Sequence, residues 1–359
     1  MAYVFDPATR LSRDVRRVAR DRLDDAIETL DRLGAQRGDA AAKAVHDVRK
    51  RCKELRALAR LVRVPLGEEQ FDGFNTIVRD VADVLAPIRD AQAVLATLDD
   101  LRAVGSAVEP DLERVRSIQA AAADQATRAI QGGDARLEQA QVMLADARTR
   151  AKRWRLPDGF DAIGPGLERS YRRGRRALRA AVERPTDEYV HEWRKSVKTL
   201  WYHARLLERA APSVLTPMIE TLDHLAEALG DDHDLAVLVE RLAADPHRYG
   251  GALQAIRAIE IARAEQEVLR RPAFRLGATI YAERPKAFVA RFETYWNNAV
   301  DEGPELTTGG ITEIPASARQ PAKPKRERST ATVTSAVSAP HEDGAHNGDT
   351  AQSPAELAN

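Results

Sequence analysis

Two segments far apart in the chain carry the same series of basic residues. Each series begins with a histidine and continues, at equal offsets, with arginine and lysine side chains. The first comprises His46, Arg49, Lys50, Lys53 and Arg60, and the second comprises His191, Arg194, Lys195, Lys198 and Arg205. On an α-helix these offsets place each series within one stripe about 100° wide. Such stripes suit anions, and arginine suits phosphate because its planar guanidinium group can donate two parallel hydrogen bonds.

The alternative role for each stripe is a solvated helix surface, which is the usual place for charged residues. Exposed helices commonly pair acidic with basic side chains four positions apart, whereas neither series contains an acidic member. Apolar residues, such as Val48 and Leu55 in the first helix and Trp193 and Leu200 in the second, occupy the opposite faces. We therefore predict helices that are anchored on one face and bind an anion on the other.

The segment preceding each series is also rich in arginine. The first contains Arg13, Arg16, Arg17, Arg20 and Arg22, and the second contains Arg169, Arg172, Arg173, Arg175, Arg176 and Arg179. Guanidinium groups at this density repel one another unless they extend into solvent or a ligand neutralises them. A bound polyanion would also favour the charged form of the two histidines, which would then be additional donors.

Composition predicts an all-α protein. Of the 359 residues, 43% are hydrophobic, 5% aromatic and 31% charged, a balance that favours helices. The formal net charge is +0, so an anion site must come from local segregation of charge, and nucleic acid is not an expected partner. The single cysteine, Cys52, excludes an internal disulfide. Neither a signal peptide nor an apolar run of about 20 residues is present, which predicts a cytoplasmic protein without membrane contact.

The order of motifs predicts an internal duplication. His191 follows His46 by 145 positions, and Asp234 follows Asp90 by 144. A segment dense in proline and glycine, LPDGFDAIGPG, separates the two copies at residues 156–166. We predict two pseudo-symmetric antiparallel helical bundles, over residues 1–156 and 157–300, followed by a disordered C-terminal tail over residues 301–359.

Within the bundles, apolar periodicity predicts the individual helices. The expected helices of the first half include 11–33, about 69–85 and about 88–101, and those of the second half include 167–182, 186–209, 214–229 and one from about residue 234. The tail is rich in proline, serine and threonine and contains one basic patch, formed by Lys323, Lys325, Arg326 and Arg328. We expect this patch to be solvated.

Two sequence patterns that are typical of enzymes occur in the second half, and neither recurs at the equivalent position of the first half. Glu188 and His191 form the Glu-x-x-His pattern of di-iron bundles, but Lys43 stands at the position equivalent to Glu188. His233 and Asp234 form the His-Asp dipeptide of metal-dependent phosphohydrolases, and the first half has Arg89 and Asp90 instead. Neither a Walker-type phosphate loop nor a Ser-His-Asp nucleophile elbow is present.

The ordered motifs resemble those of the CHAD domain, the conserved histidine α-helical domain. The matching segments are AVHDVRKRCKELRALARL, VLAPIRDAQAVL, GLERSYRRGRRALRAA, YVHEWRKSVKTLWYHARLL, LGDDHDLAVL and YAERPKAF. This resemblance implies two pseudo-symmetric helical bundles that enclose a basic cavity, and binding of inorganic polyphosphate. No acidic ExExK-like segment of a CYTH domain accompanies the motifs.

The resemblance also implies the residues of the site. From the first half these are His46, Arg49, Lys50, Lys53, Arg56 and Arg60, and from the second half they are Arg172, Arg173, Arg176, His191, Arg194, Lys195, Lys198, Arg205 and Lys286. Trp201 stands where the first repeat has Arg56. We expect a non-enzymatic polyphosphate-binding protein that needs no cofactor or metal and is associated with polyphosphate granules. The alternatives are a metal-dependent phosphohydrolase that uses His233 and Asp234, and a nucleic-acid binder.

Overall fold

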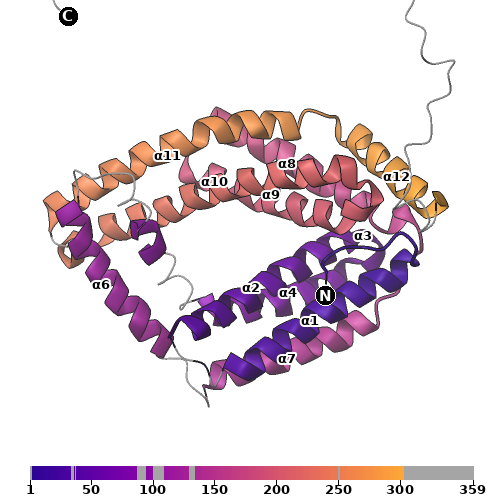
Figure 1. Ribbon diagram of the computed structural model, residues 1–359, viewed down its shortest axis with the longest axis horizontal. Coiled ribbons are helices and arrows are strands. Elements are labelled where there is room, and N and C mark those ends of the chain that lie inside the picture. The colour runs from indigo at the N-terminus through magenta and orange to yellow at the C-terminus, as the bar shows by residue number, and fades with distance from the viewer. Residues whose placement is uncertain are drawn as a thin grey trace, which may run out of the picture. The chain divides into compact units, whose positions relative to one another are not determined.

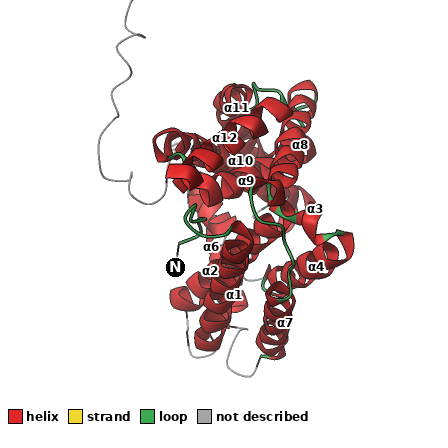
Figure 2. Cartoon of the chain, turned by 90° about the vertical axis from the view of Figure 1, so that its right-hand side faces the viewer, coloured by secondary structure: helices red, strands yellow, loops and turns green. Residues whose placement is uncertain are grey.

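The computed structural model describes residues 2–33, 36, 38–86, 94–99, 109–128, 134–249 and 251–302. Every regular element within these ranges is a helix, which confirms the predicted all-α class (Figures 1 and 2). The chain divides into a compact unit, Met1–Thr308, and a second unit, Gly309–Asn359. Both predicted bundles fall within the first unit. The basic patch of the tail lies outside the described residues.

Four helices of the first half pack as a closed set. They are α1 (Leu11–Leu33), α2 (Gly38–Leu61), α4 (Glu68–Val84) and α7 (Ala135–Lys152). Each packs against the next, and α7 returns to α1 (Figure 1). A single turn of helix, α3 (Arg63–Leu66), links α2 to α4. The bounds predicted for the first helix are confirmed.

The second half repeats this order of packing. Its helices are α8 (Gly164–Glu183), α9 (Asp187–Leu207), α10 (Pro212–Ala244) and α11 (Ala252–Ile280). Again each packs against the next, and α11 contacts α8; α12 (Pro285–Glu302) then packs on α8. Because α2 and α9 hold the same place in their respective sets, the two basic series occupy equivalent positions. The predicted internal repeat therefore has a structural counterpart.

One predicted helix boundary is wrong. The sequence GDDHD favours a break between Leu229 and Asp234, but α10 runs without interruption from Pro212 to Ala244. Gly230 is buried at this point and lies beside the Arg194 guanidinium group. Asp232 accepts hydrogen bonds from Arg270 on α11, so tertiary contacts outweigh the low helix propensity of glycine and aspartate.

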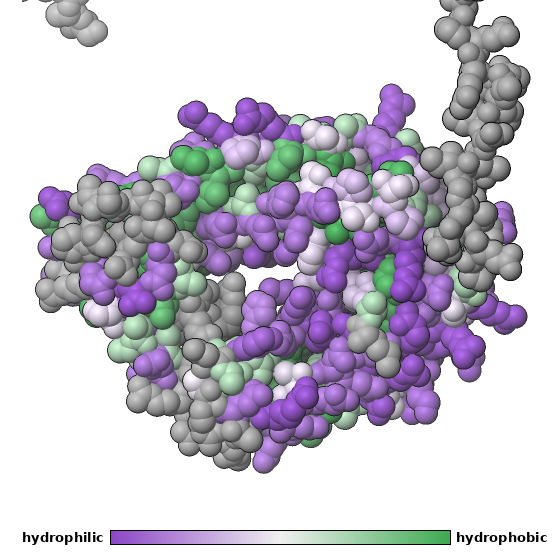
Figure 3. All heavy atoms as spheres, viewed as in Figure 1, coloured by the Kyte–Doolittle hydropathy of each residue, from purple (hydrophilic) through white to green (hydrophobic). Residues whose placement is uncertain are grey.

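A second, smaller hydrophobic cluster joins the halves away from their main contact. Val115 of α6 (Glu109–Arg128) is buried in it with Leu238 of α10 and Ala258 of α11. A segment of the first half therefore packs on the far ends of two second-half helices. Figure 3 shows an opening between the halves, and its visible rim consists largely of hydrophilic side chains.

The main contact between the halves is made by α2 with α8 and α9. Gly166 of α8 lies directly against the backbone of Leu61, and the His203 ring of α9 is 2.9 Å from the carbonyl oxygen of Ala57. Burial lowers the pKa of His203 to about 4, so this histidine is neutral and donates its Nε2 hydrogen at pH 7. A single large core includes residues from both halves.

We expect Gly166→Ala to destabilise the fold by about 2–3 kcal/mol. A Cβ atom at Gly166 would overlap the carbonyl oxygen of Leu61, and two helix backbones would have to separate. Gly73→Ala is the matched control, because its new methyl group meets only the movable end of the Arg150 side chain. Chemical denaturation of both variants measures the effect. Equal stability of the two variants would contradict this account of the contact.

Candidate functional site

A basic cavity of about 410 Å³ lies where α2, α8 and α9 meet. From α2 it is lined by Lys53, Arg56, Ala57 and Arg60, from α8 by Arg173, and from α9 by Glu192, Arg194, Lys195, Lys198, Thr199 and Tyr202. Seven of these side chains are cationic and one is acidic. All seven cations belong to the site residues predicted from the sequence, and they come from both halves.

The opposite faces of α2 and α9 explain why these cations point into the cavity. Leu55 and Leu58 of α2 are fully buried, as are Trp193 and Val197 of α9. Their burial fixes the rotation of each helix about its axis, since residues three and four positions apart share a face. The two helices therefore present their basic stripes toward one another.

Burial and mutual repulsion both act on the cations of the cavity. Burial first, and then the charges of Arg56 and Arg173, lower the pKa of Arg60 to about 10. Burial likewise lowers the pKa of Arg56 and of Lys198. Arg173 belongs to the second half and Arg60 to the first, so positive charge from both halves accumulates in one place. A bound anion would relieve this repulsion.

Few acidic groups offset the cations of the cavity. Glu192 pairs with Arg173 at 3.2 Å and with Lys195 at 2.5 Å, and Asp223 of α10 lies 3.6 Å from the Lys198 ammonium group. Sequence reasoning did not identify Glu192 as part of the site. The signal was available, because Glu192 and Lys195 are three positions apart on one helix.

Several predicted residues lie outside the lining of this cavity. His46 and Lys50 are exposed on the earlier turns of α2, and the Arg49 guanidinium group donates to the carbonyl oxygen of Ala82. Exposed side chains of α8 and α12 make up the rest, namely Arg172, Arg176 and Lys286. Arg172 pairs with Glu168 on its own helix.

Arg205 has a structural environment that the sequence did not indicate. Its guanidinium group lies 3.6 Å from the Glu54 carboxylate and 4.7 Å from the centre of the Trp201 ring. Glu54 is only 1% exposed and also pairs with Arg22 and Arg51. Arg205 therefore neutralises a buried carboxylate of α2, and this ion pair joins the two halves.

His191 stands at the edge of the basic region, and its ring lies 3.9 Å from that of His233. Burial, and then the charges of His233, Lys195 and Arg194, lower the pKa of His191 to about 4. The ring is therefore neutral at pH 7 in the free protein. Its Nδ1 atom is buried and has no hydrogen-bond partner among the described residues.

The His-Asp dipeptide lies on α10. The part of the chain that the structure describes contains no group of three or more histidine, cysteine, aspartate or glutamate side chains that could hold a metal ion. Arg89 and Asp90, the equivalent pair of the first half, lie outside the described residues. Cys52 is buried, and burial raises the pKa of its thiol to about 12.

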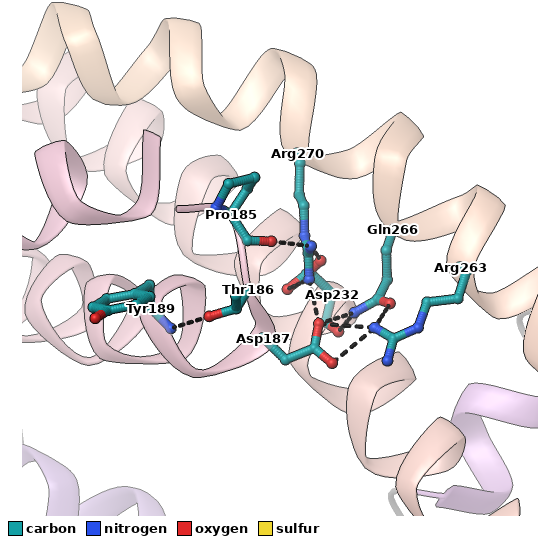
Figure 4. A network of polar contacts seen from close by, with 8 residues as sticks. All are labelled: Pro185, Thr186, Asp187, Tyr189, Asp232, Arg263, Gln266 and Arg270. Carbon is teal, nitrogen blue, oxygen red and sulfur yellow. Dashed lines mark hydrogen bonds and ion pairs between the residues drawn. The ribbon is translucent and has the colours of Figure 1, made fainter. Parts of the chain in front are cut away.

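A partly buried polar network holds the start of α9, which carries the second basic series (Figure 4). The Arg270 guanidinium group of α11 donates to Asp232 of α10 at 2.5 Å and to Asp187 of α9 at 2.6 Å. Gln266 donates to the backbone carbonyl of Asp232, and Arg263 donates to Asp187. Sequence reasoning missed this network, which ties α9, α10 and α11 together at the start of α9.

These features define an all-helical, internally duplicated protein with a basic cavity between its halves. The family model described as CHAD domain matches residues 23–243, more than half of the 359 residues. The chain therefore belongs to the CHAD domain family. No curated protein matches it. Among the described residues, no helix is both long and apolar enough to span a membrane.

A solved structure supports the same fold. The crystal structure of the CHAD domain from the plant Ricinus communis is similar to this chain with a TM-score of 0.54 and 16% sequence identity. The match covers 79% of this chain and 95% of the plant chain. At 16% identity the likeness shows the fold alone.

Proposed function

We propose that this protein binds inorganic polyphosphate in the cavity between α2, α8 and α9, without catalysis. The observation that carries the proposal is the set of seven cations, contributed by both halves, against one carboxylate. The lowered pKa of Arg60 supports it, because burial, and then repulsion by Arg56, Arg173 and Arg63, disfavours the charged form of Arg60 in the free protein. An anion of high charge density would turn this repulsion into favourable contacts.

A phosphate chain fits this arrangement better than a compact anion. The guanidinium groups of Arg60 and Arg194 can each donate paired hydrogen bonds to successive phosphates, and Lys198 adds a point charge. Exposed cations continue beyond the cavity on α2 and α8, at Lys50 and Arg176. A flexible chain can follow them, whereas a single phosphate cannot. Polyphosphate as ligand would place the protein at cytoplasmic polyphosphate granules.

A binding titration tests this proposal. Polyphosphates of several lengths, ATP and RNA are titrated in the presence of a chelator at several salt concentrations. We expect long polyphosphate to bind most tightly without a divalent metal, and its affinity to fall steeply as salt rises, by analogy with counterion release from nucleic acids. Affinity that does not change between low and physiological salt would contradict the proposal.

The same protein sample tests whether the protein binds polyphosphate without hydrolysing it. We expect no release of orthophosphate when magnesium or manganese replaces the chelator. The matched variant is Asp234→Ala, which alters the His-Asp dipeptide on α10. Metal-dependent phosphate release that disappears in this variant, while binding persists, would instead support a phosphohydrolase.

A further inference from the structure

A second basic groove lies on the first half, between α1 and α7, and has a volume of about 1360 Å³. From α1 it is lined by Arg13, Arg16, Arg17 and Arg20, and from α7 and the residue after it by Arg148, Lys152 and Arg153. It shares no lining residue with the cavity between the halves. The arginines of α1 near the N-terminus therefore line this groove and not the cavity.

Helical spacing explains how the groove forms. The four arginines of α1 lie at positions i, i+3, i+4 and i+7, which share one face. On α7, Ala145, Arg148, Thr149 and Lys152 have the same spacing. The two helices pack side by side in both ribbon views, so these faces meet along the groove (Figures 1 and 2).

Acidic neighbours neutralise only part of the positive charge. Arg17 pairs with Asp14 at 2.5 Å and with Asp21 at 3.1 Å, and Arg148 pairs with Asp24 at 2.6 Å. Asp21 also lies 3.6 Å from Arg20. Three carboxylates thus pair with cations of the groove, and the charge of Asp158 interacts with that of Arg16. The charge that remains is concentrated at one end of the groove.

That end contains three exposed cations, Arg13, Lys152 and Arg153. Their side chains have no acidic partner among the described residues. The Arg16 guanidinium group nearby donates to the backbone carbonyl of Trp154 at 3.1 Å, which holds it beside them. This end therefore has exposed donors with free hydrogen-bonding capacity beside one arginine, Arg16, that a hydrogen bond holds in place.

We propose that the groove between α1 and α7 is a second binding site for phosphate chains. This inference rests on the proposed function, because it assigns the same class of ligand to another surface. Apolar side chains are few among the described lining residues, namely Ile27, Ala145 and Ala151, so the groove offers mainly charge and hydrogen-bond donors. One protein molecule then holds two chain segments at once and links separate polyphosphate chains.

Stoichiometry tests the second site. A short polyphosphate of defined length is titrated by calorimetry into the full chain and into two triple variants. The groove variant is Arg13→Gln, Lys152→Gln and Arg153→Gln, and the cavity variant is Arg60→Gln, Arg194→Gln and Lys198→Gln. We expect two chains to bind per protein, and each variant to lose one of them through a loss of affinity of about 100-fold.

Each alternative result distinguishes the two sites. One bound chain per protein, unaffected in the groove variant and lost in the cavity variant, would overturn the second site and leave the proposed function intact. Loss of a chain in the groove variant alone, with normal binding in the cavity variant, would support the groove and overturn the cavity. Circular dichroism controls for folding, and the substituted groove residues are exposed.

Discussion

Replacing Arg60, Arg194 and Lys198 together by glutamine is expected to weaken long-chain polyphosphate binding at the cavity about 100-fold. These residues line the cavity from both halves, and each can make a charge-assisted hydrogen bond with a phosphate. A net contribution of about 1 kcal/mol for each lost contact gives this factor. Glutamine keeps much of the side-chain volume, so the change removes charge with little loss of packing.

A control and two partial variants sharpen this test. Arg271→Gln, Arg275→Gln and Arg284→Gln remove the same charge from exposed positions outside both basic sites and should change affinity only slightly. Lys53→Gln with Arg60→Gln, and Arg194→Gln with Lys198→Gln, change one half each. Both pairs should weaken binding. Normal binding after either pair is changed would show that the halves do not share a ligand.

The largest effect on stability is expected for Arg270→Met. Arg270 is only 7% exposed and is the main partner of the buried Asp232 carboxylate. Burial raises the pKa of Asp232, and the hydrogen bonds from Arg270 oppose this shift. Removing one member of a buried ion pair costs about 3–5 kcal/mol, because the remaining charge is left without compensation. Chemical denaturation measures this loss.

Arg263→Met is the matched control, since Arg263 also pairs with Asp187 but is 46% exposed. An exposed pair of this kind contributes between 0 and about 1 kcal/mol. A double variant, Arg270→Met with Asp232→Leu, should recover much of the stability, because it removes both charges. Equal destabilisation by Arg270→Met and Arg263→Met would show that burial of the ion pair does not determine its contribution to stability.

The duplicated fold could be predicted from the sequence because its signals are local. Two patterns can be read from the sequence without any tertiary contact. They are the periodicity that defines Leu11–Leu33 and the equal offsets after His46 and His191. The same offsets placed Lys53, Arg60, Arg194 and Lys198 on inward faces, and the structure gathers them in one cavity. The family resemblance, which the comparison with the CHAD model confirms, added the expectation of a shared cavity.

The remaining features depend on residues that are distant in sequence. Arg205 meets Glu54 across more than a hundred positions, so its place in a buried ion pair has no signal in its own helix. The ion pair of Arg270 and Asp232 joins two different helices and likewise has no signal within either helix. The continuity of α10 through Gly230 depends on such contacts, and for that reason local propensity predicted a break there.

Lysine footprinting tests the central claim most directly. The full chain is acetylated under limiting conditions with and without long-chain polyphosphate, in the presence of a chelator, and modification is quantified by mass spectrometry. We predict strong protection of Lys53, Lys195 and Lys198, which line the cavity, and none of Lys43 or Lys286, which are exposed elsewhere. Unchanged modification of the three cavity lysines under conditions in which polyphosphate is bound would contradict the account.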